Sequence, residues 1–173
     1  MVCVVTLLLF NGKLIFITLI IQLGLYWCTD NPGALHDDFE EKFKGLYDDF
    51  EFRFNLLYSL YSLPNVVLPL ITGVLMIKFG ARIVYLFLSF IVVFGQIIFS
   101  LGSFQSSFNL MILGRMVFGI GAESLNITQY TMIYKWFHKN ELAMPIGLTC
   151  SIAGLGRVLN DIISPIIVSV FFY

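Results

Sequence analysis

The chain has 173 residues, of which 58% are apolar, 12% are charged and 16% are aromatic. Soluble globular domains carry about twice that share of charged residues. The composition argues against a soluble domain and indicates a membrane protein surrounded by lipid. The formal net charge of -1 supplies no basic field for binding nucleic acid.

Cysteines and histidines give no sign of a metal centre or of catalysis. Cys3, Cys28 and Cys150 are odd in number and lack the spacing of a zinc site or a disulfide framework. His36 and His138 lie far apart in polar segments, so they are not expected to share a metal. Neither a P-loop nor a GxSxG elbow occurs. We therefore expect no cofactor and no enzymatic activity.

Five apolar runs follow one another along the chain, each long enough for a helix to cross a bilayer, which takes about 20 residues. They lie at about 5–28, 54–77, 83–101, 108–134 and 142–173. Strands of a membrane barrel need only about 10 alternating residues. The sequence therefore predicts an all-α membrane protein with about five transmembrane helices. Pro64 and Pro69 predict a bend in the second helix.

The polar segment at 29–53, between the first two runs, is strongly acidic. Its residues 29–52 hold eight acidic and two basic side chains. The connections on the other side of the membrane are basic and contain Lys78, Arg82, Lys135 and Lys139. The positive-inside rule places the basic connections and the N-terminus in the cytosol, and the acidic loop in a lumen or outside.

Aromatic and apolar residues recur at helical spacing in this acidic segment. They are Phe39, Phe43, Leu46, Tyr47 and Phe50. The spacing is compatible with a short amphipathic helix lying on the membrane, and a solvated loop is the alternative.

Charged residues within the apolar runs are candidates for function, because each costs several kcal/mol in lipid unless it is paired or faces water. Arg115, Gly119 and Glu123 share one face of the fourth helix at i, i+4 and i+8. Arg115 and Glu123 are separated by about 12 Å of helical rise, so each needs a partner from another helix or water. Gly119 and Gly121 leave room for a second helix or a ligand.

Further polar residues lie in the second, fourth and fifth runs. Gln129 continues the polar character of the fourth helix. Arg157 and Asp161 are one turn apart in the fifth, where they either neutralise each other or line a cavity. Tyr58, Tyr61 and Asn65 give the second helix a polar, aromatic stripe that either packs in the core or lines a cavity.

Two motifs resemble those of the major facilitator superfamily. LGRMVFGIGAE in the fourth run resembles the family's helix-4 signature. GVLMIKFGAR resembles its loop signature, with Gly73, Gly80 and Arg82 at the expected places. YWCTDNPGAL, LYSLYSLPNVVLP, FGIGAESLNITQ and KWFHKNELAMPIGL are similar to a lysosomal dipeptide-carrier branch of that family. The resemblance implies that residues 1–173 form the first part of an N-terminal six-helix half.

The branch resemblance implies a dipeptide uniporter of the lysosomal membrane that works by alternating access, together with a glycosylated lysosomal membrane partner protein. It assigns substrate contacts to Glu123, Tyr58, Tyr61 and Asn65. The branch's helix-5 arginine falls on Gly154, whereas this chain has Arg157 three residues later. Arg157 is therefore our candidate for the substrate carboxylate.

Two departures keep other interpretations open. The loop signature normally has an aspartate where this chain has Ile77, which removes a charge contact from Lys78 and Arg82. Five helices are fewer than half of a facilitator, so we expect the chain to be a truncated piece of a longer carrier. The alternatives are a non-transporting membrane subunit that binds partner helices through its glycine-rich face, or a facilitator for sugars or organic acids.

Overall fold

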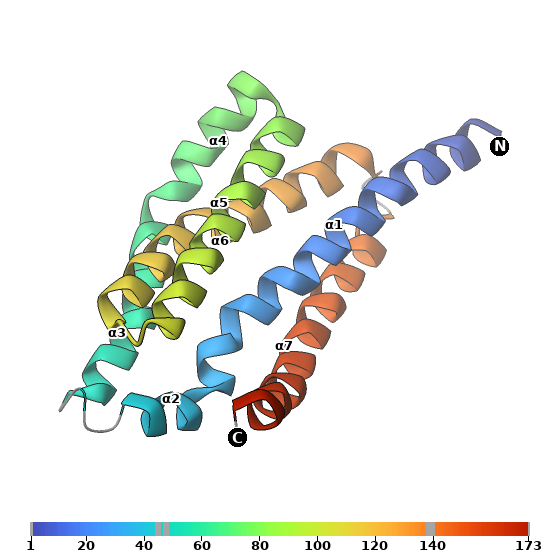
Figure 1. The fold of residues 1–173 in the computed structure, drawn as a ribbon. Coiled ribbons are helices and arrows are strands. Elements are labelled where there is room, and N and C mark those ends of the chain that lie inside the picture. The colour runs from blue at the N-terminus through green and yellow to red at the C-terminus, as the bar shows by residue number, and fades with distance from the viewer. Residues whose placement is uncertain (1, 44–45, 47–48, 138–140, 173) are drawn as a thin grey trace. The chain divides into compact units, whose positions relative to one another are not determined.

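The computed structural model describes the backbone of residues 2–43, 46, 49–137 and 141–172, and side chains from residue 16 to residue 170 within those ranges. The described elements are all helices, which confirms the predicted all-α class (Figure 1). In chain order they are α1 (Val2–Ala34), α2 (His36–Phe43), α3 (Phe50–Ser62), the 3-10 helix η1 (Leu63–Val66), α4 (Leu68–Phe79), α5 (Ala81–Phe104), α6 (Phe108–Trp136) and α7 (Ala143–Phe172).

Among the described residues, three helices are long and apolar enough to cross a membrane, and a bent pair makes a fourth span if it is counted as one. The three are Ala81–Phe104, Phe108–Trp136 and Ala143–Val170, and the bent pair joins Phe50–Val66 to Leu68–Phe79. The chain is therefore a multi-pass membrane protein. The first predicted run, 5–28, falls within α1, where the side chains of residues 1–15 lie outside the described part.

The predicted bend in the second run is present. α3 and α4 are separated by η1 and meet at an angle of 49°. Pro64 and Pro69 lie at the start of η1 and α4, where a residue without an N–H costs no helical hydrogen bond. The backbone N–H of Val67 donates to Pro64 O at 3.2 Å across the bend.

The chain folds as two compact units, residues 1–34 with 129–173, and residues 35–128. In the first unit, α1 packs along α7. The two helices come closest at Gly156, where an added Cβ would lie 2.7 Å from Leu23 O. One face of α7 is buried and small or polar; it consists of Thr149, Ala153, Gly156, Asn160 and Ser164.

In the second unit, glycines let α5 and α6 approach each other closely. A Cβ at Gly95 would lie 2.4 Å from the backbone nitrogen of Phe118, and one at Gly114 would lie 2.5 Å from that of Phe99. Side chains larger than hydrogen would force the two helices apart at both places.

The segment predicted as an acidic loop is mostly helical. α1 continues past the predicted end at Cys28 to Ala34, α2 follows, and α3 begins at Phe50. The aromatic face of α2 lies against protein, because Phe39 and Phe43 are 5% and 0% exposed. They belong to an apolar core with Phe50, Phe54, Leu57, Phe99, Phe108 and Met111. The interpretation as a helix lying on lipid is therefore wrong, although the helical spacing was informative; Leu46 is exposed, and Tyr47 lies outside the described residues.

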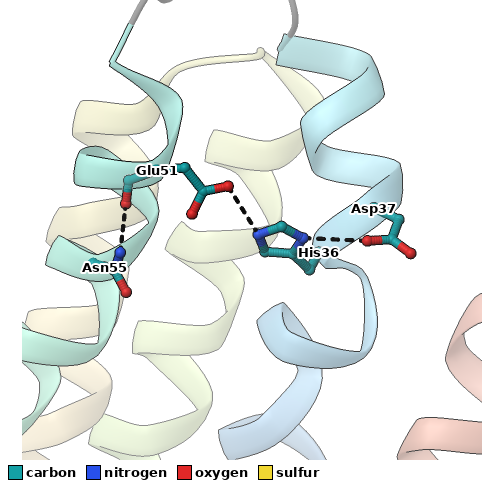
Figure 2. Close-up of polar contacts among 4 residues, drawn as sticks. All are labelled: His36, Asp37, Glu51 and Asn55. Carbon is teal, nitrogen blue, oxygen red and sulfur yellow. Dashed lines mark hydrogen bonds and ion pairs between the residues drawn. The ribbon is translucent and has the colours of Figure 1, made fainter.

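Polar contacts also tie α2 to its neighbours in this unit. Figure 2 shows His36 between two acids, with Nε2 3.5 Å from Glu51 Oε1 and Nδ1 3.2 Å from Asp37 Oδ1. The imidazole meets the Phe54 ring edge-on at 4.6 Å between ring centres. Lys42 Nζ donates to Ser103 O at the end of α5, at 2.5 Å. These exposed contacts position α2 over the apolar core.

Candidate functional site

Arg115 of α6 is held by aromatic rings. Its side chain is 2% exposed, and its guanidinium carbon lies 4.4 Å from the ring centre of Phe99 and 5.3 Å from that of Phe118. A cation over an aromatic face gains electrostatic energy that helps to offset burial. Phe99 belongs to α5, so the predicted contact with another helix is present. Arg115 thus ties α5 to α6.

Gly119 and Gly121 are positions of helix packing. A Cβ at Gly119 would lie 2.3 Å from Tyr61 O on α3, and one at Gly121 would lie 2.6 Å from Val92 Cγ2 on α5. The sequence left open whether a helix or a ligand approaches these glycines. In the structure, the neighbours are helices of this same chain.

Glu123 lies near the middle of the candidate span Phe108–Trp136 and is partly buried. No salt bridge joins it to a basic side chain in the part of the chain that the structure describes. It follows Gly119 by one turn, about 6 Å of rise. The Gly119–Tyr61 contact therefore brings α3 to within about a turn of this carboxylate.

The candidates of the bent α3–η1–α4 segment differ in their surroundings. The Tyr61 ring packs against Phe118 at 5.9 Å between centres, whereas Tyr58 is 36% exposed. Asn65 lies in η1, where its Oδ1 is buried without a hydrogen-bond donor among the described residues. Asn65 follows Tyr61 by four positions in the chain, and Glu123 follows Gly119 by four.

Gln129 is 1% exposed, and neither atom of its amide has a hydrogen-bond partner within the described ranges. A buried polar group without a partner costs about 1–3 kcal/mol. An amide in that position is suited to a polar contact with a ligand.

In the unit of α1 and α7, Arg157 pairs with α1. Its Nε lies 3.2 Å from Asp30 Oδ2, and its guanidinium carbon lies 4.6 Å from the ring centre of Tyr26. The alternative in which Asp161 neutralises Arg157 is therefore wrong. Asp30 was assigned to the acidic loop, but α1 continues through it as a helix and carries it alongside α7. The missed signal is the one-turn spacing of Tyr26 and Asp30.

A hydrogen-bonded group of side chains lies beside this ion pair. Asn160 is fully buried and accepts hydrogen bonds at Oδ1 from Ser164 Oγ at 2.7 Å and from Asn31 Nδ2 at 3.3 Å. Its Nδ2 lies 3.5 Å from Asp161 Oδ1. Sequence reasoning did not single out Asn31 or Ser164. Together with Tyr26, Asp30 and Arg157, the three residues Asn31, Asn160 and Ser164 form what we call the α1–α7 polar cluster.

Comparison with known proteins decides the family. The family model for the Major Facilitator Superfamily matches residues 3–173, nearly the whole chain. The chain belongs to the major facilitator superfamily. It is 40% identical over 138 residues to the lysosomal dipeptide transporter MFSD1 of Danio rerio, covering 79% of this chain and 29% of that protein.

Two mammalian relatives match the chain with similar identity and coverage. Identity to the lysosomal dipeptide transporter MFSD1 of Mus musculus is 40% over 151 residues, or 86% of this chain and 32% of the relative. Identity to the Homo sapiens protein of the same name is 38% over 138 residues, which cover 79% of this chain and 29% of the relative. The chain thus spans about a third or less of the length of these relatives, and the resemblance to this branch of the superfamily is confirmed.

The superfamily's loop signature lies between α4 and α5. Gly80 has φ of 84°, a conformation that side-chain-bearing residues rarely adopt, so it ends α4 and begins α5. Nothing described lies within 4 Å of a Cβ built at Gly73. Ile77, which replaces the signature's aspartate, is 88% exposed, and Lys78 Nζ lies 5.5 Å from the Phe79 ring centre. Arg82 is also exposed.

Proposed function

We propose that this chain is part of a facilitator that carries dipeptides across the lysosomal membrane, with Glu123 and Arg157 as its substrate ligands. The observation that carries the proposal is the position of two charged side chains near the middle of candidate membrane spans. Glu123 lies near the middle of Phe108–Trp136, and Arg157 lies near the middle of Ala143–Val170. An acid and a base at the centre of membrane spans are costly unless they serve a polar ligand or a partner.

The two charges match the ends of a dipeptide zwitterion. A carboxylate binds an ammonium, and a guanidinium binds a carboxylate, in each case with charge-assisted hydrogen bonds. The proposal also assigns polar contacts with the substrate to hydroxyl and amide groups of four residues, Tyr58, Tyr61, Asn65 and Gln129. The buried, unpartnered atoms of Asn65 and Gln129 in the described part of the chain support this assignment.

The remaining features of the proposal come from similarity to the branch. They are uniport by alternating access between two halves about a midplane site, residence in the lysosomal membrane and a glycosylated lysosomal membrane partner protein. A cytosolic N-terminus is proposed from the charge pattern of the connections.

Uptake of a labelled dipeptide into liposomes that contain the longer carrier of which we propose this chain is part tests the proposal. We expect saturable flux with the wild-type protein, and loss of at least nine-tenths of it, about tenfold or more, with Glu123→Gln, because the substrate ammonium loses its ionic partner. Glu141→Gln changes an exposed acid outside the spans and serves as the matched control. Undiminished flux with Glu123→Gln would remove the residue assignment, and no saturable flux with the wild type would remove the function.

The other interpretations lose support or can be tested directly. The glycine-rich face of α6, which favoured a non-transporting subunit, is occupied by α3 and α5 of this chain. A facilitator of sugars or organic acids predicts that those solutes, in excess, abolish dipeptide uptake. We expect competition only from dipeptides.

A further inference from the structure

Arg157 contacts two residues of α1, the acid Asp30 and the aromatic ring of Tyr26. Asp30 Oδ2 lies 3.2 Å from Nε at one edge of the guanidinium, while the guanidinium carbon lies over the Tyr26 ring, 4.6 Å from its centre. The guanidinium is planar and rigid, so an ion pair at its Nε edge and an aromatic ring beside its carbon together restrict its orientation.

Tyr26 and Asp30 are one turn apart on α1, which places both on the side of that helix that meets α7. Close by, Asn31 Nδ2 of α1 donates to Asn160 Oδ1 at 3.3 Å and to Ser164 Oγ at 3.5 Å, and these bonds join α1 to α7. The two contacts with Arg157 are therefore made from a rigid surface and not from a loop.

The Arg157 side chain nevertheless remains 52% exposed, and that of Asp30 is 37% exposed. A guanidinium has five N–H donors, more than one carboxylate can use. Because the Arg157 side chain is half exposed near the middle of its span, a second carboxylate can approach the edge of the guanidinium that Asp30 does not contact.

We propose that Asp30 and Tyr26 are positioning residues that orient Arg157 to receive the C-terminal carboxylate of the substrate. This inference rests on the proposed dipeptide function and specifies how one end of the substrate is recognised. Asp30 fixes the inner edge of the guanidinium, and Tyr26 fixes its plane. The remaining edge then presents parallel N–H groups that suit a carboxylate. Specificity for a free C-terminus follows from this arrangement.

The test compares two ligands that differ only at the C-terminus, alanyl-alanine and its C-terminal amide. Their affinities are measured with the same purified carrier, the one used for the uptake test, in phosphatidylcholine nanodiscs, by displacement of labelled alanyl-alanine. The wild-type protein should prefer the free acid. Asp30→Asn should weaken binding of the free acid about tenfold and leave the amide unchanged, so that the preference disappears. A role limited to stability would affect both ligands alike.

Three further variants complete the experiment. Asp161→Asn is the matched control, because Asp161 lies one turn from Arg157 yet makes no ion pair with it. It should keep the preference for the free acid. Tyr26→Leu removes the ring and should reduce the preference, whereas Tyr26→Phe keeps the ring and should retain it. Tyr26→Leu also tests the proposal independently if Asp30→Asn does not fold.

Each outcome either supports or overturns the proposed role of Asp30 and Tyr26. Loss of the preference in Asp30→Asn and Tyr26→Leu, but not in the controls, supports the proposal. Unchanged or tighter binding of the free acid by Asp30→Asn would overturn it, since Asp30 would then be a competitor of the substrate. Equal weakening of both ligands would also overturn it. A wild-type protein that binds neither ligand would refute the proposed dipeptide function itself, which is a distinguishable result.

Discussion

Replacement of Gly119 by alanine tests the close packing of α3 on α6. The new Cβ would lie 2.3 Å from Tyr61 O, and the two next atoms, at 3.1 and 3.2 Å, are also backbone. Ordinary contact begins near 3.4 Å, so the helices must separate by about 1 Å. No flexible side chain can move aside to absorb this overlap.

The expected magnitude combines two opposing effects. Overpacking costs about 1–3 kcal/mol, whereas alanine in place of a helical glycine gains at most about 1 kcal/mol. The net loss should be about 1–2 kcal/mol, which corresponds to a decrease in Tm of roughly 2–8 °C for a chain of this size.

Thermal unfolding of the purified protein in detergent, followed by scanning fluorimetry, measures this loss. Gly73→Ala is the matched control, because nothing described lies within 4 Å of its added Cβ. Its Tm should be unchanged or slightly higher. If Gly119→Ala is as stable as Gly73→Ala, the inferred contact between α3 and α6 is wrong.

Three other substitutions have definite expectations. Gly80→Ala should lower Tm through a loss of about 1–2 kcal/mol, because φ at this turn is 84°; an unchanged Tm would contradict the turn geometry. Arg115→Lys should lower the Tm, since an ammonium does not reproduce the planar contact with the Phe99 and Phe118 rings; a Phe99→Leu variant should lose most of this sensitivity. Asn160→Ala should cost about 1–3 kcal/mol, because Asn31 and Ser164 both lose the buried amide oxygen to which they donate, and a fluorimetry trace identical to wild type would refute that role.

The spans and the bend were predictable from sequence because they depend on local properties. Apolar run length predicted most of the spans, and Pro64 and Pro69 predicted the bend. Hydropathy, however, indicates where a chain passes from lipid to water, and a helix can continue past that point. That is why α1 was expected to stop at Cys28, although it continues through Asp30 to Ala34.

Contacts between helices were less predictable, because periodicity identifies a face but not what covers it. The spacing of Phe39 and Phe43 was helical, yet it could not distinguish lipid from a protein core. Likewise, Asp161 was the nearest acid to Arg157 in sequence, but Asp30 is its partner in space. A pairing across 127 positions leaves no local signal.

Chemical labelling at Glu123 tests most directly the claim that this carboxylate reaches a water-filled substrate site. The protein would carry Glu123→Cys on a background in which Cys3, Cys28 and Cys150 are replaced by serine. We predict that a water-soluble, charged thiol reagent modifies this position in liposomes, because the position faces water. A position that reacts only after denaturation would contradict the account.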